Sequence, residues 1–390
     1  MVRKILLISR AIAFCLCAGL LLIRCEAASK DSTEGAPIRI GVVLSLSGER
    51  STYGKDCLKG INMALDLAND MGGIKGRKVE LVVRDDNSSV VKTMQATQDL
   101  SQSPSVLAVL GGTGSKLALA GASIAQELKI AFMTPLATNT DVTDIGTYIS
   151  RICFSDSYQG PALADYSFKF LKLKSAGIIF NPEDEYSLGL ATSFKRHYME
   201  IGGEVLLEIF QSPAESDSAM IIRAIMNKKP DAIYMPGYHA EAANLAVLLK
   251  HSGMNVAMLG SDGWESPEFL EKTSPILTDT DRVYITTHFS PDDNHPLVQR
   301  FVADYKGLYG ELPTAPAALG YDAAGVLCEA LRRTPQLERR AISESINSIS
   351  DFEGVTGNIT IDEKRNAVKD VVILKAYGGR FVFETTTRIR

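Results

Sequence analysis

Apolar runs alternate with stretches of helical periodicity along most of the chain. The first run, IRIGVVLSL at residues 38–46, is predominantly apolar, as expected for a strand that is buried on both faces. The next stretch places Leu58, Ile61 and Leu65 on one face of a helix that ends at the Gly-Gly pair 72–73. Further strands are predicted at 79–86, 105–111, 130–135, 176–180, 205–210, 232–237, 257–262 and 283–288.

Strands that alternate with helices predict parallel sheets with helices on both faces. The predicted strands form two successive series, one ending at 130–135 and the other beginning at 176–180. A chain of 390 residues also exceeds the size that a single hydrophobic core comfortably supports. We therefore expect an α/β protein of two doubly wound lobes, closely connected because no long linker separates the two series.

The loop after residues 105–111 is rich in glycine, with the sequence GGTGS at 111–115. Loops of this kind often bind phosphates, but a P-loop requires a lysine directly after its last glycine, and here Ser115 intervenes before Lys116. A dinucleotide-binding loop needs a third glycine where this chain has Leu117. What remains is a turn of exposed backbone N–H groups before a helix predicted at 116–128, and such a turn binds anions, carboxylates included.

The segments that follow the predicted strands differ between the two series. Parallel sheets place their ligand sites at the carboxyl ends of strands. In the first series these ends are rich in hydroxyl groups and glycine. In the second series they offer carboxylates and aromatic rings: Asp184, Glu185, Tyr186, Tyr238, Asp262 and Trp264. One lobe that donates to an anion and another that accepts from a cation would together suit a zwitterion.

Charge and the amino-terminal pattern limit the partners and the location. A net charge of −5 leaves no basic surface for nucleic acid. Residues 1–28 have the basic start, short apolar core and small final residues of a secretory signal peptide, cleaved after Ala27 or Ala28. A lipoprotein signal ending at Cys25 is the alternative, although Arg24 stands where a small residue is expected. No later segment is long and apolar enough to span a membrane.

The cysteines do not suggest a disulfide scaffold or a zinc site. Three of the six lie in the predicted signal peptide, and the others are few and far apart in sequence. We interpret Cys57, Cys153 and Cys328 as buried apolar side chains, with one bridge of unassigned pairing as the alternative.

No catalytic or metal-binding pattern is present in the sequence. The five histidines include no pair at the i, i+4 spacing of a helical zinc site. Ser123, in GASIA at 121–125, stops one glycine short of a nucleophile elbow and falls within a predicted helix. His288 and His295 flank an Asp-Asp pair that could bind a metal, but a surface loop is the preferred interpretation. We therefore expect neither an enzyme nor a bound metal or cofactor.

Several motifs, in their order along the chain, resemble one family. The segment SLSGERSTYGKDCLKGINMALDLANDMGGIKGRKVELVVRDD at 45–86 is similar to the start of type I periplasmic binding proteins of the branched-chain amino acid class. The resemblance continues through GGTGS, MTPLATN, SRICFSDSYQGPALADY, GSDGW and GYDAAGVL. It implies two doubly wound lobes that are joined by three crossover strands and close on a ligand between them.

The resemblance also implies how the chain is divided between the lobes. The crossovers would fall near Cys153, Thr286 and Val355. Lobe I would then comprise residues 37–153 and 287–355, and lobe II residues 154–286 and 356–390. Residues 371–386 resemble the final strand pair that is added to the second lobe.

Site residues follow from the family position by position. Ser115 and Thr138 match residues that bind the α-carboxylate of the ligand, and Leu136 matches a residue whose carbonyl meets the α-ammonium group. Asp262 matches an acidic residue that pairs with the ammonium group, where branched-chain receptors have the longer Glu. Three aromatic positions that line the pocket are matched by tyrosines: Tyr53, Tyr186 and Tyr238.

Each of these assignments has a structural alternative. Ser115 and Thr138 could cap the helices that follow them, and Asp262 could occupy an ordinary Asp-Gly turn. Trp264 is a further candidate that either stacks on the ligand or packs in the core. Pro316 stands where branched-chain receptors have an aromatic residue, which leaves the side-chain subsite open.

The resemblance implies an extracytoplasmic, periplasmic receptor of an ABC importer, acting as a monomer with a membrane permease and its cytoplasmic ATPase subunits. The expected ligand is a small L-amino acid with an aliphatic side chain, because the proposed pocket wall contains no Arg or Lys. Two alternatives remain open at this point. One is a free-standing sensory protein for a small carboxylate or amide, since the same fold serves both roles. The other is an enzyme on a doubly wound scaffold.

Overall fold

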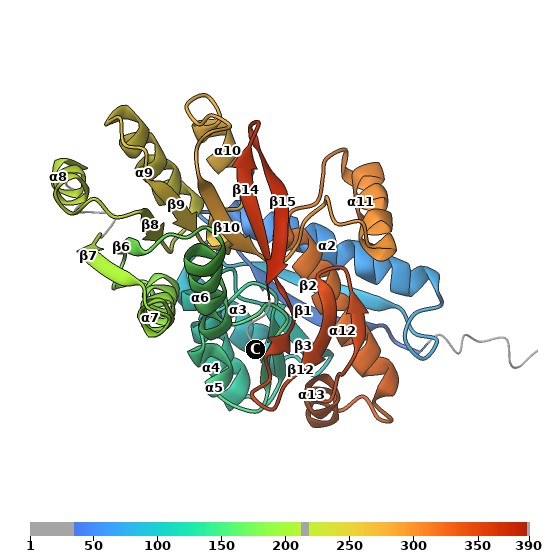
Figure 1. Ribbon diagram of the computed structural model, residues 1–390. Helices are drawn as coiled ribbons and strands as arrows, with labels where there is room; N and C mark the ends of the chain where they lie inside the picture. Colours follow the sequence, from blue (N-terminus) through green and yellow to red (C-terminus); the bar gives the residue numbers. More distant parts are fainter. Residues whose placement is uncertain (1–34, 212–217, 388–390) are drawn as a thin grey trace, which may run out of the picture. The chain divides into compact units, whose positions relative to one another are not determined.

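The computed structural model describes residues 35–211 and 218–387. The predicted signal peptide at 1–28 and the alternative lipid anchor at Cys25 lie outside the described residues. From Ile38 onward the chain forms one compact unit that contains two large sheets and one small sheet (Figure 1).

The first large sheet is wholly parallel, in the strand order β2-β1-β3-β4-β5. Its strands are β1 (Ile38–Leu44), β2 (Val79–Asp85), β3 (Val106–Gly111), β4 (Ala131–Thr134) and β5 (Ile149–Arg151). The helices that connect them are α2 (Ser51–Asp70), α3 (Val90–Gln102), α4 (Ser115–Glu127) and the short α5 (Asp141–Asp144). The four strands predicted from apolar runs are confirmed, whereas β5 was missed because three residues are too few to show a pattern.

The second large sheet has the order β15-β14-β10-β9-β8-β6-β7. Its parallel strands are β6 (Ser175–Phe180), β7 (Glu204–Phe210), β8 (Ala232–Met235), β9 (Ala257–Gly260) and β10 (Val283–Thr287). The helical segments around them are α6 (Asp156–Asp165), η1 (Tyr166–Phe170), α7 (Glu185–Glu200), α8 (Ser218–Lys228), α9 (His239–His251), η2 (Asp262–Trp264) and α10 (Pro267–Thr273). All five predicted strands of the second series are confirmed.

The chain ends on an antiparallel pair, β14 (Val371–Tyr377) and β15 (Arg380–Thr387). Strand β14 pairs with β10 in antiparallel orientation, so the pair extends the second sheet, as the family resemblance implied.

Three helices follow β10: α11 (Pro296–Tyr309), α12 (Ala315–Arg333) and α13 (Arg339–Asn347). Helix α12 packs along α2 (Figure 1). Glycines allow the close contact, because a Cβ on Gly60 would lie only 1.8 Å from the carbonyl oxygen of Ala317. A Cβ on Gly320 would likewise lie 2.2 Å from the carbonyl oxygen of Cys57. This packing holds the beginning of α12 in a defined place beside the first sheet.

The small sheet consists of β11 (Phe352–Gly354), β12 (Gly357–Ile361) and β13 (Ala367–Val368). We expected residues from 356 onward to belong to the second lobe. Instead, Ile359, Ile361 and Ala367 pack in the same core as Ile40 and Val42 of β1. Residues up to Ala367 therefore contribute apolar side chains to the first lobe, and the other lobe boundaries stay predictions.

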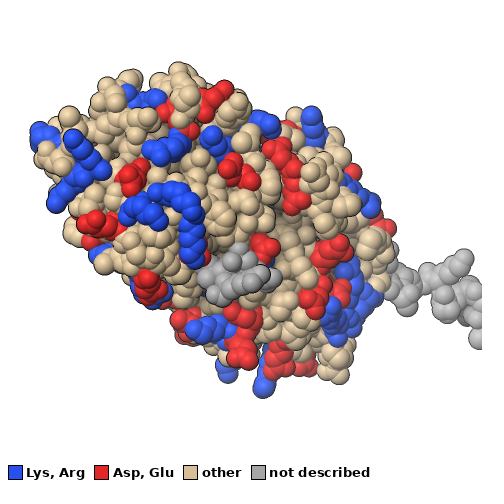
Figure 2. Space-filling model, in the orientation of Figure 1, with Lys and Arg blue, Asp and Glu red and all other residues tan. Residues whose placement is uncertain are grey.

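Cys57, Cys153 and Cys328 are buried and unbridged, which confirms their interpretation as buried apolar side chains. Burial raises the pKa of the Cys328 thiol to about 11. Within the described ranges, no helix combines the length and apolar character needed to cross a membrane. On the face shown in Figure 2, acidic and basic side chains are interspersed.

Candidate functional site

The glycine-rich loop after β3 shapes one side of the site. Gly112 and Gly114 have φ angles of 89° and 104°, in the region that favours glycine. A Cβ on Gly112 would also lie 2.6 Å from the Cβ of Ala118. The loop can therefore turn tightly and bring the start of α4 to the carboxyl end of the sheet.

Ser115 is the first residue of α4, and its side chain is buried. Its hydroxyl accepts a hydrogen bond from the backbone N–H of Asn139 at 3.2 Å. Gly114 is the N-cap residue of α4, and no side chain caps this helix. The Ser115 hydroxyl thus contacts the neighbouring loop and does not cap its own helix.

The loop after β4 carries Leu136 and Thr138. The Thr138 carbonyl accepts from the backbone N–H of Asp156 at 2.8 Å. Its buried hydroxyl interacts with the carboxyl group of Asp156, although it makes no hydrogen bond of ordinary geometry to any described residue.

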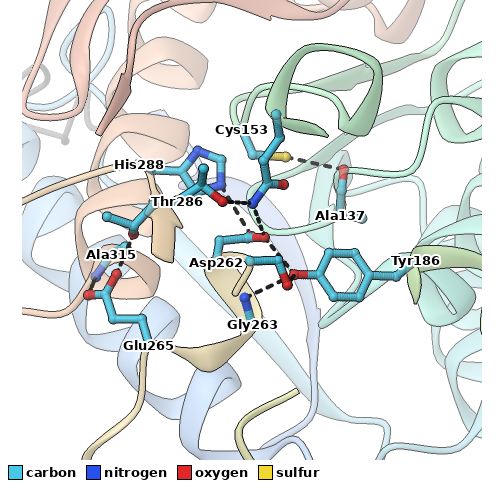
Figure 3. Close-up of polar contacts among 12 residues, drawn as sticks. Ala137, Cys153, Tyr186, Asp262, Gly263, Glu265, Thr286, His288 and Ala315 are labelled. Atoms are coloured by element: carbon cyan, nitrogen blue, oxygen red, sulfur yellow. Dashed lines mark hydrogen bonds and ion pairs between the residues drawn. The ribbon is translucent and has the colours of Figure 1, made fainter. Parts of the chain in front are cut away.

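Asp262 lies two residues after the end of β9, where it contacts three side chains (Figure 3). Gln159 and the Tyr186 hydroxyl donate hydrogen bonds to Oδ1, at 2.8 and 2.6 Å. The Nε2 atom of His288 lies 3.3 Å from Oδ2. Gln159 also contacts the hydroxyl of Thr286 at 2.7 Å, which ties Asp262 to the end of β10.

The protonation states at this carboxylate follow from burial and hydrogen bonding. Burial raises the pKa of Asp262, but the donors around it, His288 first, outweigh burial, and the pKa ends below its usual value. Burial lowers the pKa of His288 to about 4, although the Asp262 carboxylate opposes this shift. Near neutral pH, Asp262 is therefore a largely buried anion, with its side chain 15% exposed, whose contacts in the described part of the chain are neutral donors.

Three tyrosines pack around the carboxylate. The Tyr53 hydroxyl donates to the carbonyl oxygen of Gly263 at 2.6 Å and lies 2.5 Å from Nδ1 of His239. The ring of Tyr238 lies between the other two, with centroids 5.0 Å from Tyr186 and 6.1 Å from Tyr53. Tyr53 belongs to α2 beside the first sheet, so these contacts join the two large sheets.

A small cavity of about 40 Å³ lies among these groups, and we call it the inner cavity. The predicted site residues that line it are Ser115, Leu136, Asp262, Tyr53, Tyr186, Tyr238 and Pro316. One cavity is thus lined by residues that are far apart in sequence, some from the loop after β3 and others from the start of η2. From the sequence we expected a ligand site between two lobes to be formed in this way.

Two predicted residues lie elsewhere. Trp264 is wholly buried among apolar side chains of the second sheet, and its indole N–H donates to the carbonyl of Met235 at 2.9 Å. Its ring packs beside Phe269 and directly over Gly260, where no Cβ would fit. The stacking role is therefore wrong in this structure, and Trp264 is a core residue. Thr138 does not line the inner cavity either, although it is buried two residues beyond Leu136.

Sequence reasoning missed part of the site. His288 was assigned to a surface loop, yet it is buried, stacks on Phe154 and contacts Asp262. Its position directly after β10 was the available signal, because strand ends were the places to search. Gln159 lies inside α6, and no local pattern marks it as a neighbour of residue 262. Arg50 was also not predicted as a site residue, although it directly precedes α2 and its guanidinium group lies over the ring of Tyr238.

Comparison with known proteins agrees with this fold. A family model described as periplasmic binding protein matches residues 37–380. A leucine-binding protein from Thermotoga maritima has 33% sequence identity and a TM-score of 0.84, over 90% of this chain and 99% of that chain. A branched-chain amino acid transporter substrate-binding protein from Streptococcus pneumoniae, solved in complex with isoleucine, has 26% identity and a TM-score of 0.82 over 90% and 99% of the two chains.

Among curated proteins, Leu/Ile/Val-binding protein homolog 1 of Brucella suis is 24% identical over 330 residues, which cover 84% of this chain and 87% of that protein. The fold is thus that of the type I periplasmic binding proteins. The chain belongs to the periplasmic binding protein family. The three relatives described above are named as binding proteins of leucine or of branched-chain amino acids.

Proposed function

We propose that this protein is the extracytoplasmic substrate-binding receptor of an ABC importer, and that its ligand is a small L-α-amino acid. The observation that carries this proposal is the chemistry of the inner cavity. A largely buried carboxylate, that of Asp262, lies at the cavity with neutral donors around it, and Ser115 lines the same space.

An amino acid complements both groups. Its ammonium group would neutralise Asp262, because a buried charge without a counter-charge costs several kcal/mol. Its carboxylate would meet Ser115 and the glycine-rich loop, where backbone N–H groups and the α4 N-terminus favour an anion. The rings of Tyr53, Tyr186 and Tyr238 and the ring of Pro316 would contact aliphatic carbon atoms of the side chain.

The role in transport is inferred from the relatives. The similar proteins are named as transporter substrate-binding proteins, and such a receptor delivers its ligand to a permease with cytoplasmic ATPase subunits. We infer the same partners here and a location outside the cytoplasm, for which residues 1–28 would provide the signal peptide. We further propose that the receptor acts as a monomer.

A thermal-shift screen of the purified protein tests this proposal. The panel contains the twenty amino acids, their des-amino analogues, aromatic acids, amides and urea. A ligand at 100 times its Kd stabilises the folded state by about 2.7 kcal/mol, which is readily measured. We expect stabilisation by one or a few L-amino acids and not by their des-amino analogues. Stabilisation by simple carboxylic acids or amides alone would favour the sensory alternative, and no response to any amino acid would contradict the proposal.

A further inference from the structure

A second cavity, of about 350 Å³, adjoins the inner cavity. We call it the outer cavity. Tyr53 and Tyr238 line both cavities, whereas Ser115 and Asp262 line only the inner one and Arg50 only the outer one. The two tyrosine rings therefore stand between a region that suits an amino-acid head group and a region that contains a guanidinium group.

Arg50 is held in place from three directions. Its side chain is only 12% exposed. The guanidinium carbon lies 3.9 Å from the centroid of the Tyr238 ring, Nη2 lies 3.5 Å from the Asp184 carboxylate, and Nε lies 3.5 Å from the exposed Glu49. Burial lowers the pKa of Arg50, but Tyr238 and Asp184 outweigh burial and raise it, so the group stays charged.

The guanidinium group is incompletely bonded. Both ion pairs of Arg50 are long. The guanidinium group and the buried Tyr238 hydroxyl interact with each other, yet neither Nη1 nor the hydroxyl makes a hydrogen bond of ordinary geometry to any described group. Both atoms lie beside Gly114, because a Cβ on that residue would be 2.6 Å from Nη1 and 3.0 Å from the hydroxyl oxygen. A buried guanidinium N–H without a well-placed acceptor is costly, so a further acceptor is expected at this point.

An acceptor can reach this point from the inner cavity, because Tyr53 and Tyr238 line both cavities. Arg50 does not line the inner cavity, so a ligand head group bound by Ser115 and Asp262 would leave the guanidinium to a more distant atom of the ligand. The path leads past Tyr53 and Tyr238, which belong to both cavities. The atom that reaches Arg50 would then belong to the ligand side chain.

We propose that Arg50 and the Tyr238 hydroxyl form a side-chain subsite, and that the amino-acid ligand ends in an oxygen acceptor, a carboxylate or a carboxamide. This inference rests on the proposed amino-acid receptor function and names the ligand's side-chain chemistry. It replaces the expectation from sequence that the pocket wall contains no cation. The aliphatic part of the side chain still contacts the tyrosine rings.

The charges around Arg50 bear on which acceptor is bound. Asp184 and Glu49 already compensate part of the guanidinium charge, and Glu241 lines the same cavity with one buried oxygen that has no partner among the described residues. A carboxamide would offer an oxygen to Arg50 and N–H donors to such a carboxylate oxygen. A side-chain carboxylate would satisfy Arg50 alone.

Matched ligands test the subsite by calorimetry on the wild-type protein. Two sets of ligands have side chains of similar shape within each set. The first set is leucine, asparagine and aspartate, and the second set, with side chains one carbon longer, is homoleucine, glutamine and glutamate. We expect the polar members of at least one set to bind about ten- to a hundredfold more tightly than the hydrocarbon member, as one hydrogen bond to a charged group provides. The stronger polar ligand identifies the acceptor as carboxylate or carboxamide.

Arg50→Met should abolish this preference while leaving the hydrocarbon member bound with similar affinity. Tyr238→Phe keeps the ring and should reduce the preference in the same direction. Lys92→Met is the control, because Lys92 is an exposed cation that lines neither cavity, and it should leave the preference unchanged. Comparing ratios within a ligand set cancels any general effect of a variant on folding or closure.

Two results would overturn the subsite. One is hydrocarbon side chains binding as tightly as their polar counterparts. The other is Arg50→Met weakening every ligand by the same factor, which would make Arg50 a contact between the lobes only. Both results leave the amino-acid receptor function intact. The failure of every amino acid to bind would instead contradict the receptor function, and with it this subsite.

Discussion

Ser115 shows how one hydroxyl can serve either a ligand or the protein itself. Ser115→Ala should remove one charge-assisted hydrogen bond to the ligand carboxylate, worth roughly 1.5–3 kcal/mol, or about ten- to a hundredfold in Kd. The variant also leaves the backbone N–H of Asn139 without its acceptor, so the free energy of unfolding without ligand should fall by about 1 kcal/mol. Calorimetry and thermal unfolding measure the two effects separately.

Ser123→Ala is the matched control on the same helix, because its hydroxyl is exposed and donates to the carbonyl of Leu119. It should leave ligand affinity unchanged. If Ser115→Ala lowers the melting temperature while the affinity stays as in wild type, the hydroxyl serves only the protein.

Asp262 is the residue at which the ammonium group can be tested directly. Asp262→Ala should cost on the order of 2–5 kcal/mol in binding an amino acid, as removing one member of a buried charge pair does. For the des-amino analogue the same substitution should be neutral or favourable, because the buried carboxylate no longer lacks a counter-charge. Calorimetry with both ligands on both proteins separates these outcomes. Equal losses for the two ligands would show that Asp262 does not bind the ammonium group.

At the scale of elements, the N-terminus of α12 receives a hydrogen bond acceptor from Glu265, which directly follows η2. One carboxylate oxygen of Glu265 accepts a hydrogen bond from the backbone N–H of Ala315 at 3.0 Å, and the other accepts from the hydroxyl of Thr287 (Figure 3). The first N–H groups of a helix have no partner within it, so this contact satisfies one of them. Glu265 thereby links η2 and β10 to a helix that packs against α2.

Burial raises the pKa of Glu265, and the negative charges of Asp262 and Asp56 raise it further. The hydrogen bonds from Thr287 and Ala315 lower the pKa but do not outweigh these effects, and the pKa ends at about 7. A carboxyl whose pKa is raised in the folded state favours that state while it is protonated. Its contribution is therefore lost as the pH rises from the ordinary value near 4.5 through about 7. The loss should be on the order of 3 kcal/mol.

Glu265→Gln should remove this pH dependence, because the amide is neutral and keeps an oxygen for Ala315. Thermal unfolding between pH 5 and 8 is the measurement: the wild type should lose stability relative to the variant as the pH rises. Glu268→Gln on α10 is the control. Glu268 is exposed, and although its partial burial would raise its pKa, the hydroxyl of Thr52 and other donors outweigh that effect and lower the pKa. Glu268 should therefore stay ionised throughout this pH range, and its replacement should not change the pH profile. Parallel pH profiles for wild type and Glu265→Gln would exclude the role assigned to Glu265.

At the scale of the whole molecule, the groups that we propose for the ligand come from both sheets. Ser115 follows a strand of the first sheet and Asp262 a strand of the second, so we expect full affinity to require that the two lobes close on the ligand. Several contacts between elements of the two sheets accompany this arrangement, among them the hydrogen bond of 2.6 Å from the Asn139 amide to the carbonyl of Glu185. Opening would break these contacts.

Small-angle scattering should therefore show a smaller radius of gyration with saturating ligand than without it. Asp262→Ala, which retains the lobes but loses the ammonium contact, should need a higher ligand concentration for the same change. A scattering curve that does not change at saturation would contradict a site built from two moving lobes.

Much of the fold follows from local sequence, because strands and helices of this length show their burial through periodicity. The nine longer parallel strands were predicted from apolar runs, and the strand-end rule pointed to Ser115 and Asp262. The roles of these two residues came from a family resemblance and remain predictions. Short strands were not predicted, because β5, β11 and β13 contain too few residues for a hydrophobic pattern to appear.

Only the tertiary structure decided which side chains face each other. Trp264 and Asp262 are two residues apart in one short helix, yet one packs in the core and the other faces the inner cavity. His288 and Gln159 reach Asp262 from β10 and α6, and Arg50 reaches Tyr238 from the start of α2. Periodicity predicts which side chains of an element face the core, but it does not predict which distant segment packs against them. The charge balance of the site, a buried carboxylate and a buried guanidinium on either side of two tyrosine rings, depends on those distant contacts.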